Sequence, residues 1–209
     1  MARSKPSRLD AKSRQLRDTA RQLFLQYGFL ATTTDRIAAA AGMSKATLYA
    51  RYHRKEDLLA DVLADLIQTL GPPLPEPVSL LTFPILQQRL EALAHATVTQ
   101  LMHPEYLALI RILIAEMTTQ PELGELFVRA VPQAVLDRTA STLTAARDAG
   151  LLHLSDPLVA ARALIGPLLT FVLIDGLLAR TPQVPDPQHL TDVVDVFLHG
   201  VLSSQRSPS

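Results

Sequence analysis

The sequence predicts an all-α fold, and three observations support this prediction. Leu and Ala are the most abundant residues, which favours helices. Aromatic residues make up only 5% of the chain, Trp is absent, and no run of alternating β-branched residues indicates a strand. Apolar residues recur at helical spacing over most of the chain, which predicts about nine helices. At 209 residues, 48% of them hydrophobic, the chain can form one large or two small domains.

Residues 33–55 have the pattern of two short helices joined by a turn. Thr33 and Ser44 are residue types that commonly cap helix N-termini. Gly42 lies where a turn between two helices needs a left-handed residue, and Ile37 contributes to a small apolar face. In a helix-turn-helix of this kind the second helix enters the DNA major groove. The stretch therefore predicts a DNA-binding element.

The zero net charge of the chain conceals an uneven distribution. Residues 1–60 contain twelve Lys and Arg against five Asp and Glu, which gives a net charge of +7. Because the whole chain is neutral, the remaining residues carry −7. A solvated basic helix face is the ordinary explanation of such an excess. Its coincidence with the helix-turn-helix pattern favours a nucleic-acid-binding end of the chain.

The composition excludes several kinds of site. The chain has no Cys, which excludes disulfides, thiol catalysis and Cys-ligated zinc. The six His residues show no metal-ligand spacing and no Gly-rich phosphate loop is present, so we expect no metal, no cofactor and no enzymatic activity. The charged N-terminus lacks the apolar core of a signal peptide, and the longest apolar run, 163–174, is too short to span a membrane. We therefore expect a soluble cytoplasmic protein without membrane contact.

A proline-rich segment, residues 71–82, divides the chain into two predicted domains. The DNA-binding domain is expected over 10–70 and a second helical domain over 83–204. The helices expected outside the helix-turn-helix cover residues 10–27, 55–70, 83–102, 104–118, 121–149 (with interruptions at Gly124 and Pro132), 157–179 (with a kink at Gly166-Pro167) and 187–203.

Residues 10–70 resemble the TetR family of transcriptional regulators. The elements that carry the resemblance are Thr33, Ile37-Ala38, Ala41-Gly42-Met43-Ser44, Leu48-Tyr49, Tyr52 and Lys55-Glu56. Met43 replaces the more usual Val, Tyr52 replaces the more usual Phe, and His53 stands where Pro or Ser is common. Further along, the segments PELGELFVRAV and GLLHLSDPLVAAR look like one C-terminal subgroup of the family.

The second helix of the motif supplies the residues expected to read DNA. Its first turn and a half should face base edges, and it contains Ser44, Lys45, Ala46 and Thr47. The resemblance implies phosphate contacts or their support by Thr33, Thr34, Tyr49, Arg51, Tyr52 and Lys55. Three of these residues have an alternative role: Ser44 as a cap only, Lys45 as a solvated charge, and Tyr52 as a packing residue under the first helix.

The last helix has a wide apolar stripe at helical spacing. It consists of Leu190, Val193, Val194, Phe197, Leu198 and Val201, together with Leu202. An intrachain core would explain the stripe. The resemblance instead implies a homodimer in which the last two helices of each subunit form a four-helix bundle. A dimer presents two recognition helices about one DNA turn apart, and hence binds a palindromic operator in double-stranded DNA.

Polar residues inside apolar runs are candidates for orienting a small-molecule effector. They are His95, Arg111, Glu116 and Asp175, and the candidate apolar lining residues are Met102, Met117, Phe127 and Phe171. Buried ion pairs, dimer contacts and ordinary core packing explain these residues equally well. The resemblance implies a ligand-responsive regulator, most simply a repressor that a small apolar or amphipathic effector releases from its operator. The alternatives are a DNA-binding dimer without an effector, or an enzyme in the apolar domain.

Overall fold

The computed structural model describes residues 8–69, 82–117, 121, 123–125 and 132–202, and these residues form helices and no strands. This confirms the predicted all-α class. The chain forms two compact units, which are described separately below. The first comprises residues 1–66 and 108–131, and the second comprises residues 67–107 and 132–209. The predicted proline-rich boundary lies almost entirely outside the described residues, so the domain limits stay a prediction.

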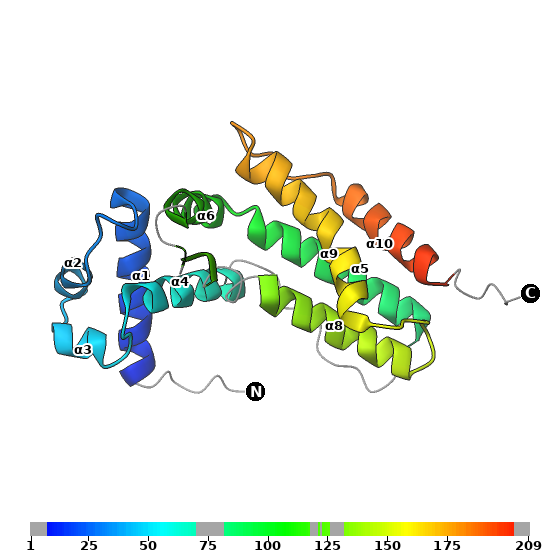
Figure 1. Cartoon of the computed structure of the whole chain (residues 1–209), viewed down its shortest axis with the longest axis horizontal. Coiled ribbons are helices and arrows are strands. Elements are labelled where there is room, and N and C mark those ends of the chain that lie inside the picture. Colours follow the sequence, from blue (N-terminus) through cyan, green and yellow to red (C-terminus); the bar gives the residue numbers. More distant parts are fainter. Residues whose placement is uncertain (1–7, 70–81, 118–120, 122, 126–131, 203–209) are drawn as a thin grey trace, which may run out of the picture. The chain divides into compact units, whose positions relative to one another are not determined.

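The first unit contains four helices from the N-terminal part of the chain and the later turns of a fifth (Figure 1). They are α1 (Arg8–Tyr27), α2 (Thr34–Ala40), α3 (Lys45–Tyr49), α4 (Lys55–Thr69) and α6 (Pro104–Met117). α2 packs on both α1 and α3. The core of this unit consists mainly of Leu16, Ala20, Phe24, Phe29, Ile37, Ala38, Leu48, Leu58, Leu59, Val62, Leu63 and Leu66, each no more than 2% exposed.

The capping residues of the helix-turn-helix adopt the predicted roles. The side-chain oxygen of Thr33 accepts a hydrogen bond from the N–H of Arg36 (3.2 Å), and that of Ser44 accepts one from the N–H of Thr47 (3.2 Å). Gly42 has a φ of +63°, the left-handed conformation that ends α2. The N–H of Met43 donates back to the carbonyl of Ala38 (2.8 Å), which closes the turn.

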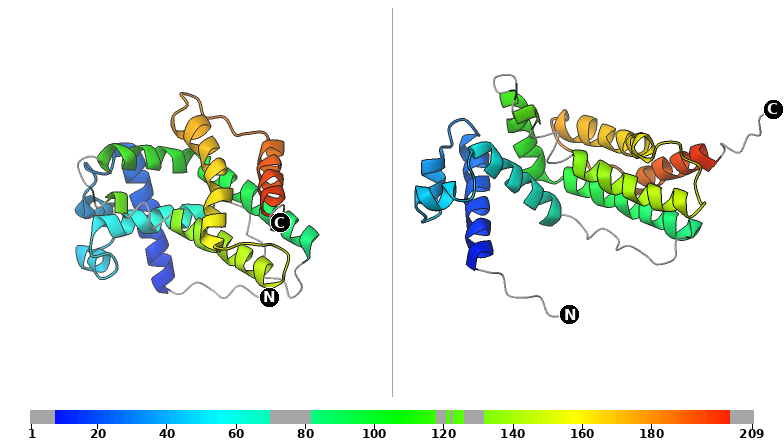
Figure 2. Two further views of the ribbon diagram at one scale, coloured as in Figure 1. Left: turned by 45° about the vertical axis from the view of Figure 1, so that its right-hand side comes forward. Right: turned by 60° about the horizontal axis from the view of Figure 1, so that its bottom comes forward.

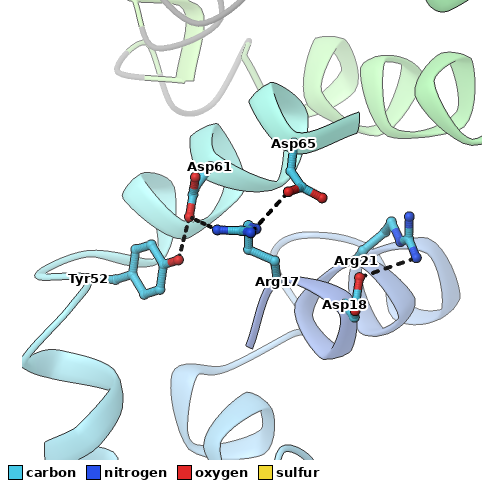
Figure 3. Close-up of polar contacts among 6 residues, drawn as sticks. All are labelled: Arg17, Asp18, Arg21, Tyr52, Asp61 and Asp65. Carbon is cyan, nitrogen blue, oxygen red and sulfur yellow. Dashed lines mark hydrogen bonds and ion pairs between the residues drawn. The ribbon is translucent and has the colours of Figure 1, made fainter. Parts of the chain in front are cut away.

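A partly buried polar cluster fastens α4 to α1 (Figure 3). The guanidinium of Arg17 on α1 lies 3.1 Å from an oxygen of Asp61 and 3.0 Å from an oxygen of Asp65, both on α4. The hydroxyl of Tyr52 donates to the same Asp61 oxygen at 2.5 Å. Arg17 Nε is buried without a partner among the described residues. The positive charge of the guanidinium is therefore balanced by the carboxylates of Asp61 and Asp65. The cluster therefore fixes the two longer helices that carry α2 and α3.

The second unit contains the remaining helices. They are α5 (Phe83–Leu101), the first turn of α6, α8 (Pro132–Asp148), α9 (Pro157–Phe171), the π-helix η1 (Val172–Leu177) and α10 (Pro187–Leu202). α9 packs on α8, and α10 packs on α5 and α9, as both views in Figure 2 show. Asp156 caps α9 by accepting hydrogen bonds from the N–H groups of Leu158 (2.8 Å) and Val159 (3.3 Å).

The helix predicted over 121–149 with interruptions has helical residues at 121 and 123–125, and α8 begins at Pro132, one of the two predicted interruptions. The helix predicted over 157–179 continues through Pro167 as α9, and the π-helix begins at Val172. The predicted kink at Gly166-Pro167 stays a prediction. A Cβ atom on Gly176 would lie 2.7 Å from Met102 Sδ, so a larger residue here would require the Met102 side chain to shift.

Residues Pro157–Leu177 form a helical run of 21 residues with a mean hydropathy of 2.0, longer than the run predicted from the sequence. By length and composition alone it could cross a membrane, a test that core helices of soluble proteins also pass. Only 33% of its most apolar window is buried within the chain. The helix therefore presents a large apolar surface that the chain itself does not cover.

The Tyr52 cluster gives a pH-dependent prediction. Burial, followed by the hydrogen bond to Asp61, raises the pKa of Tyr52 to about 12 from 10.0. A raised pKa means that the stabilisation is fully present below pH 10 and is lost as the pH rises towards 12. We expect the stability advantage of the wild type over Tyr52→Phe to shrink by about 1–2 kcal/mol across this interval, measured by urea unfolding. An advantage that is constant with pH would contradict this role of Tyr52.

Candidate nucleic-acid interface

The N-terminal part of α3 presents the predicted base-reading residues to solvent. Ser44, Lys45 and Ala46 are exposed and Thr47 is half-buried. The hydroxyls of Ser44 and Thr47 lie 2.9 Å apart and share a hydrogen bond, so Ser44 has the capping role that was predicted as an alternative. Capping does not prevent a base contact, because a hydroxyl both donates and accepts. The exposure of this turn is what insertion into a DNA groove requires.

Two contacts tie exposed side chains of α3 to the first turn of α2. The Lys45 ammonium forms an ion pair with the carboxylate of Asp35. The hydroxyls of Thr34 and Tyr49 lie 2.9 Å apart and share a hydrogen bond. Thr34 and Tyr49 were both predicted to contact phosphate, and the structure brings them together on one surface. That both side chains contact phosphate stays a prediction.

Arg51 and Tyr52 follow α3 and differ sharply in exposure. Arg51 is exposed and remains a candidate for phosphate contact. Tyr52 is only 6% exposed, and its hydroxyl is directed at Asp61. Tyr52 therefore has the packing role that the sequence offered as the alternative, because a phosphate cannot approach a phenol that is buried between α1 and α4.

Lys55, the first residue of α4, has a structural role that sequence reasoning missed. Its Nζ donates to the carbonyls of Phe29 (2.7 Å) and Thr32 (3.0 Å) and lies 4.1 Å from the centroid of the Phe29 ring. Burial lowers the pKa of Lys55, and the nearby carboxylates of Glu56 and Glu116 oppose this effect. Lys55 thus ties the loop between α1 and α2 to α4. An ammonium has three donors, so one remains for the predicted phosphate contact.

The predicted dimer stripe of α10 divides into two faces. Leu190, Val194 and Leu198 are at most 3% exposed, because residues four apart on α10 face the chain's own core. The prediction that these three form an interface is wrong. The other three residues, Val193, Phe197 and Val201, line an open groove between α9 and α10. The groove also includes Val159, Ala160, Ala163, Pro167, Val196 and Gly200.

The predicted effector residues are divided between the two units. Those in the second unit are His95, Met102, Phe171 and Asp175, and those in the first unit are Arg111, Glu116 and Met117. His95 Nε2 lies 3.4 Å from the Thr191 hydroxyl, Met102 is 4% exposed, Phe171 stacks on His189, and Arg111 is exposed. Phe127 lies outside the described residues. A contact of any of these residues with an effector stays a prediction.

Three buried polar residues of the second unit were not predicted as site residues. Thr97 and Gln100 on α5 and Tyr106 on α6 are between 3% and 7% exposed. Burial alone raises the pKa of Tyr106, and among the described residues no side chain or carbonyl accepts from its hydroxyl. Nothing in the helical pattern of apolar residues indicated that these three side chains would be buried.

Within the described residues, no group of three or more His, Asp or Glu is placed to hold a metal ion.

The position of Lys55 gives a prediction that combines stability and DNA binding. Lys55→Ala should lower the free energy of unfolding by about 1.5–3 kcal/mol, because two backbone carbonyls lose a charged donor. It should also weaken binding to every DNA sequence and flatten the salt dependence by about one unit, as the loss of a phosphate contact does.

The control for this variant is Arg54→Ala, which removes the exposed charge of the residue before Lys55. It should change the free energy of unfolding by no more than about 0.5 kcal/mol. Urea unfolding and DNA titrations at several salt concentrations measure the two effects separately. Unchanged stability would refute the tie between α4 and the α1–α2 loop, and an unchanged salt slope would refute the phosphate contact.

Comparisons with known proteins agree with this geometry. Residues 16–62 match the family model described as bacterial regulatory proteins of the tetR family. Residues 88–200 match the model described as the C-terminal domain of AefR-like transcriptional repressors. The two matches cover the helix-turn-helix unit and most of the second unit. No curated protein matches the chain.

Two solved structures resemble nearly the whole chain. The flavonoid-responsive regulator FrrA is 30% identical, with 94% of this chain and 99% of that chain covered and a TM-score of 0.70. A TetR transcriptional regulator from Agrobacterium tumefaciens is 25% identical, with 91% and 94% covered and a TM-score of 0.75. Together with the exposed recognition turn of α3, these matches show that the chain belongs to the TetR family of DNA-binding transcriptional regulators.

Proposed function

We propose that the chain is a homodimeric, ligand-responsive repressor that acts in the cytoplasm and binds a palindromic operator in double-stranded DNA. The observation that carries the DNA-binding part is the exposed first turn of α3, with Ser44, Lys45 and Ala46 directed to solvent. The matched C-terminal model, named for transcriptional repressors, supports repression rather than activation. The chain functions without a cofactor and without enzymatic activity in this proposal.

The groove between α9 and α10 supports the homodimer. Its apolar rim includes Val159 and Val196, which are 62% and 74% exposed, and neighbouring Leu173 and Ile174 are 46% and 55% exposed. Contiguous apolar surface of this kind is typical of protein interfaces. A symmetric pair of such faces would bury α9 and α10 of both subunits against one another. This interface would also cover the apolar run of α9 and η1.

The buried Tyr106 hydroxyl supports an effector site in the second unit. The side chain is 3% exposed and its pKa is raised by burial, and an effector that supplies a hydrogen-bond acceptor would bind the phenol. We therefore propose an amphipathic effector, with an apolar body and at least one carbonyl or hydroxyl oxygen. The relative FrrA is a flavonoid-responsive regulator, and flavonoids have this chemistry. The effector would shift the dimer towards a conformation that does not fit the operator.

Selection of bound duplexes from a random DNA pool by the full chain tests this function. The proposal expects an enriched inverted repeat whose half-site centres are about 10 base pairs, or a multiple of that, apart. Adding a mixture of flavonoids to the bound complex should release the DNA if the effector class is correct. Failure to enrich any sequence would overturn the proposal of operator binding, and an enriched single half-site would overturn the dimer.

The dimer face gives a separate prediction. Val196→Asp should weaken the dimer at least about 100-fold, because a carboxylate would be buried without a partner in both subunits. Sedimentation measures the change, and operator binding should fall with it. Ala92→Asp puts the same charge on an exposed position of α5 outside the groove and should remain dimeric. If Val196→Asp also remains dimeric, the interface lies on another surface.

The effector site predicts a specific effect of removing one hydroxyl. Tyr106→Phe should leave the free energy of unfolding within about 1 kcal/mol of the wild type, because the substitution removes one hydroxyl and keeps the packed ring. The concentration of effector that releases DNA should rise about tenfold, as loss of one buried hydrogen bond does. Tyr27→Phe, at a half-exposed position of the first unit, is the matched control. Equal responses of both variants would contradict the role of Tyr106.

A further inference from the structure

The ion pair between Lys45 and Asp35 joins the recognition helix to the helix before it. Lys45 is the first residue of α3, and Asp35 lies in the first turn of α2. Both side chains are exposed, at 62% and 54%. The hydrogen bond to Asp35 raises the pKa of Lys45, so the ammonium remains charged in the pair. The most exposed cation of the recognition turn is therefore already engaged before DNA arrives.

Asp35 is an acidic residue on a surface that otherwise attracts DNA. Its sequence neighbours are Thr34, which bonds Tyr49, and Arg36, whose guanidinium lies 3.6 Å over the Tyr27 ring. Exposed Arg51 and Arg54 follow α3. A carboxylate here repels DNA phosphates. Asp35 does not cap α2, because the cap is Thr33, but its charge in the first turn favours the helix through the helix dipole. Among the described residues, its polar contact with another helix is the ammonium of Lys45.

The effect of the pair on DNA binding depends on the acceptor that Lys45 meets. In a complex with arbitrary sequence, a free lysine binds a phosphate and releases a counterion. A lysine held by a carboxylate contributes much less to that process. A base edge such as guanine O6 and N7 is a neutral acceptor, and a three-donor ammonium can bond it without leaving Asp35. The pair therefore weakens non-specific binding more than operator binding.

We propose that Asp35 is a specificity-determining residue, which holds the Lys45 ammonium at the start of α3 and withholds it from phosphates. This inference rests on the DNA-binding function and on the operator contact of Lys45. Asp35 thus raises the ratio of operator affinity to non-specific affinity, although it lowers total affinity. Asp35 does not itself bind DNA. It acts on DNA binding by holding Lys45 and by repelling the phosphates.

The test compares Asp35→Asn with the wild type on two duplexes. One is an operator obtained by selection, and the other is a mixed-sequence duplex of equal length. Affinities are measured at several salt concentrations. Asp35→Asn should bind the mixed duplex roughly 3–10 times more tightly near 0.1 M salt, with a salt slope steeper by about one unit. Operator affinity should rise by a smaller factor, so the specificity ratio should fall.

Asp18→Asn is the matched control. The side chain of Asp18 is 48% exposed, and like Asp35 it forms an ion pair, in this case with Arg21 on α1. It produces the same change in net charge away from the recognition turn and should leave the salt slope unchanged. In a Lys45→Ala background, Asp35→Asn should lose most of its effect on the salt slope, because only the direct repulsion between the carboxylate and the phosphates then remains.

Three results would overturn the inference: a salt slope of Asp35→Asn equal to that of Asp18→Asn, an unchanged specificity ratio, or an Asp35 effect that is equally large without Lys45. If the wild type binds neither duplex, the DNA-binding function itself fails. That outcome is distinct from the failure of Asp35 alone.

Discussion

The ion pairs between Arg17 and the aspartates of α4 are the constraint on which the DNA-binding unit depends. α2 and α3 have only 7 and 5 residues, and isolated helices of that length are not stable in water. They persist because α1 and α4 hold them. Arg17 fixes the two long helices, Tyr52 joins the same cluster from the end of α3, and Lys55 ties the α1–α2 loop to α4. The recognition turn is thus exposed yet firmly anchored.

The local features of this unit could be predicted from sequence, because each depends on a few adjacent residues. Thr33 and Ser44 cap helices through hydrogen bonds to residues three positions later, and Gly42 adopts the left-handed conformation that its turn requires. The charge division and the spacing of the motif likewise pointed to DNA. Membership of the TetR family follows from the same short-range pattern, and the family comparisons confirm it.

Long-range partners could not be predicted, because helical spacing does not say what lies opposite. The stripe on α10 was uniform in sequence, but α5 and α9 cover only the face with Leu190, Val194 and Leu198. Lys55 matched a family position for phosphate contact, but its two carbonyl partners lie more than twenty residues earlier. The π-helix that begins at Val172 brings Gly176 close to the Met102 side chain, and no local pattern indicates this contact.

Amide hydrogen exchange of the full chain without DNA tests the central claim most directly. If α1 and α4 hold the recognition helices, the amides of Ala41, Met43 and Tyr52, which close the turns of α2 and α3, should open with the same free energy as the amides of the α4 core. Arg17→Met should lower both sets together. Recognition-helix amides that open about 2 kcal/mol or more below α4, and that do not respond to Arg17→Met, would contradict the account.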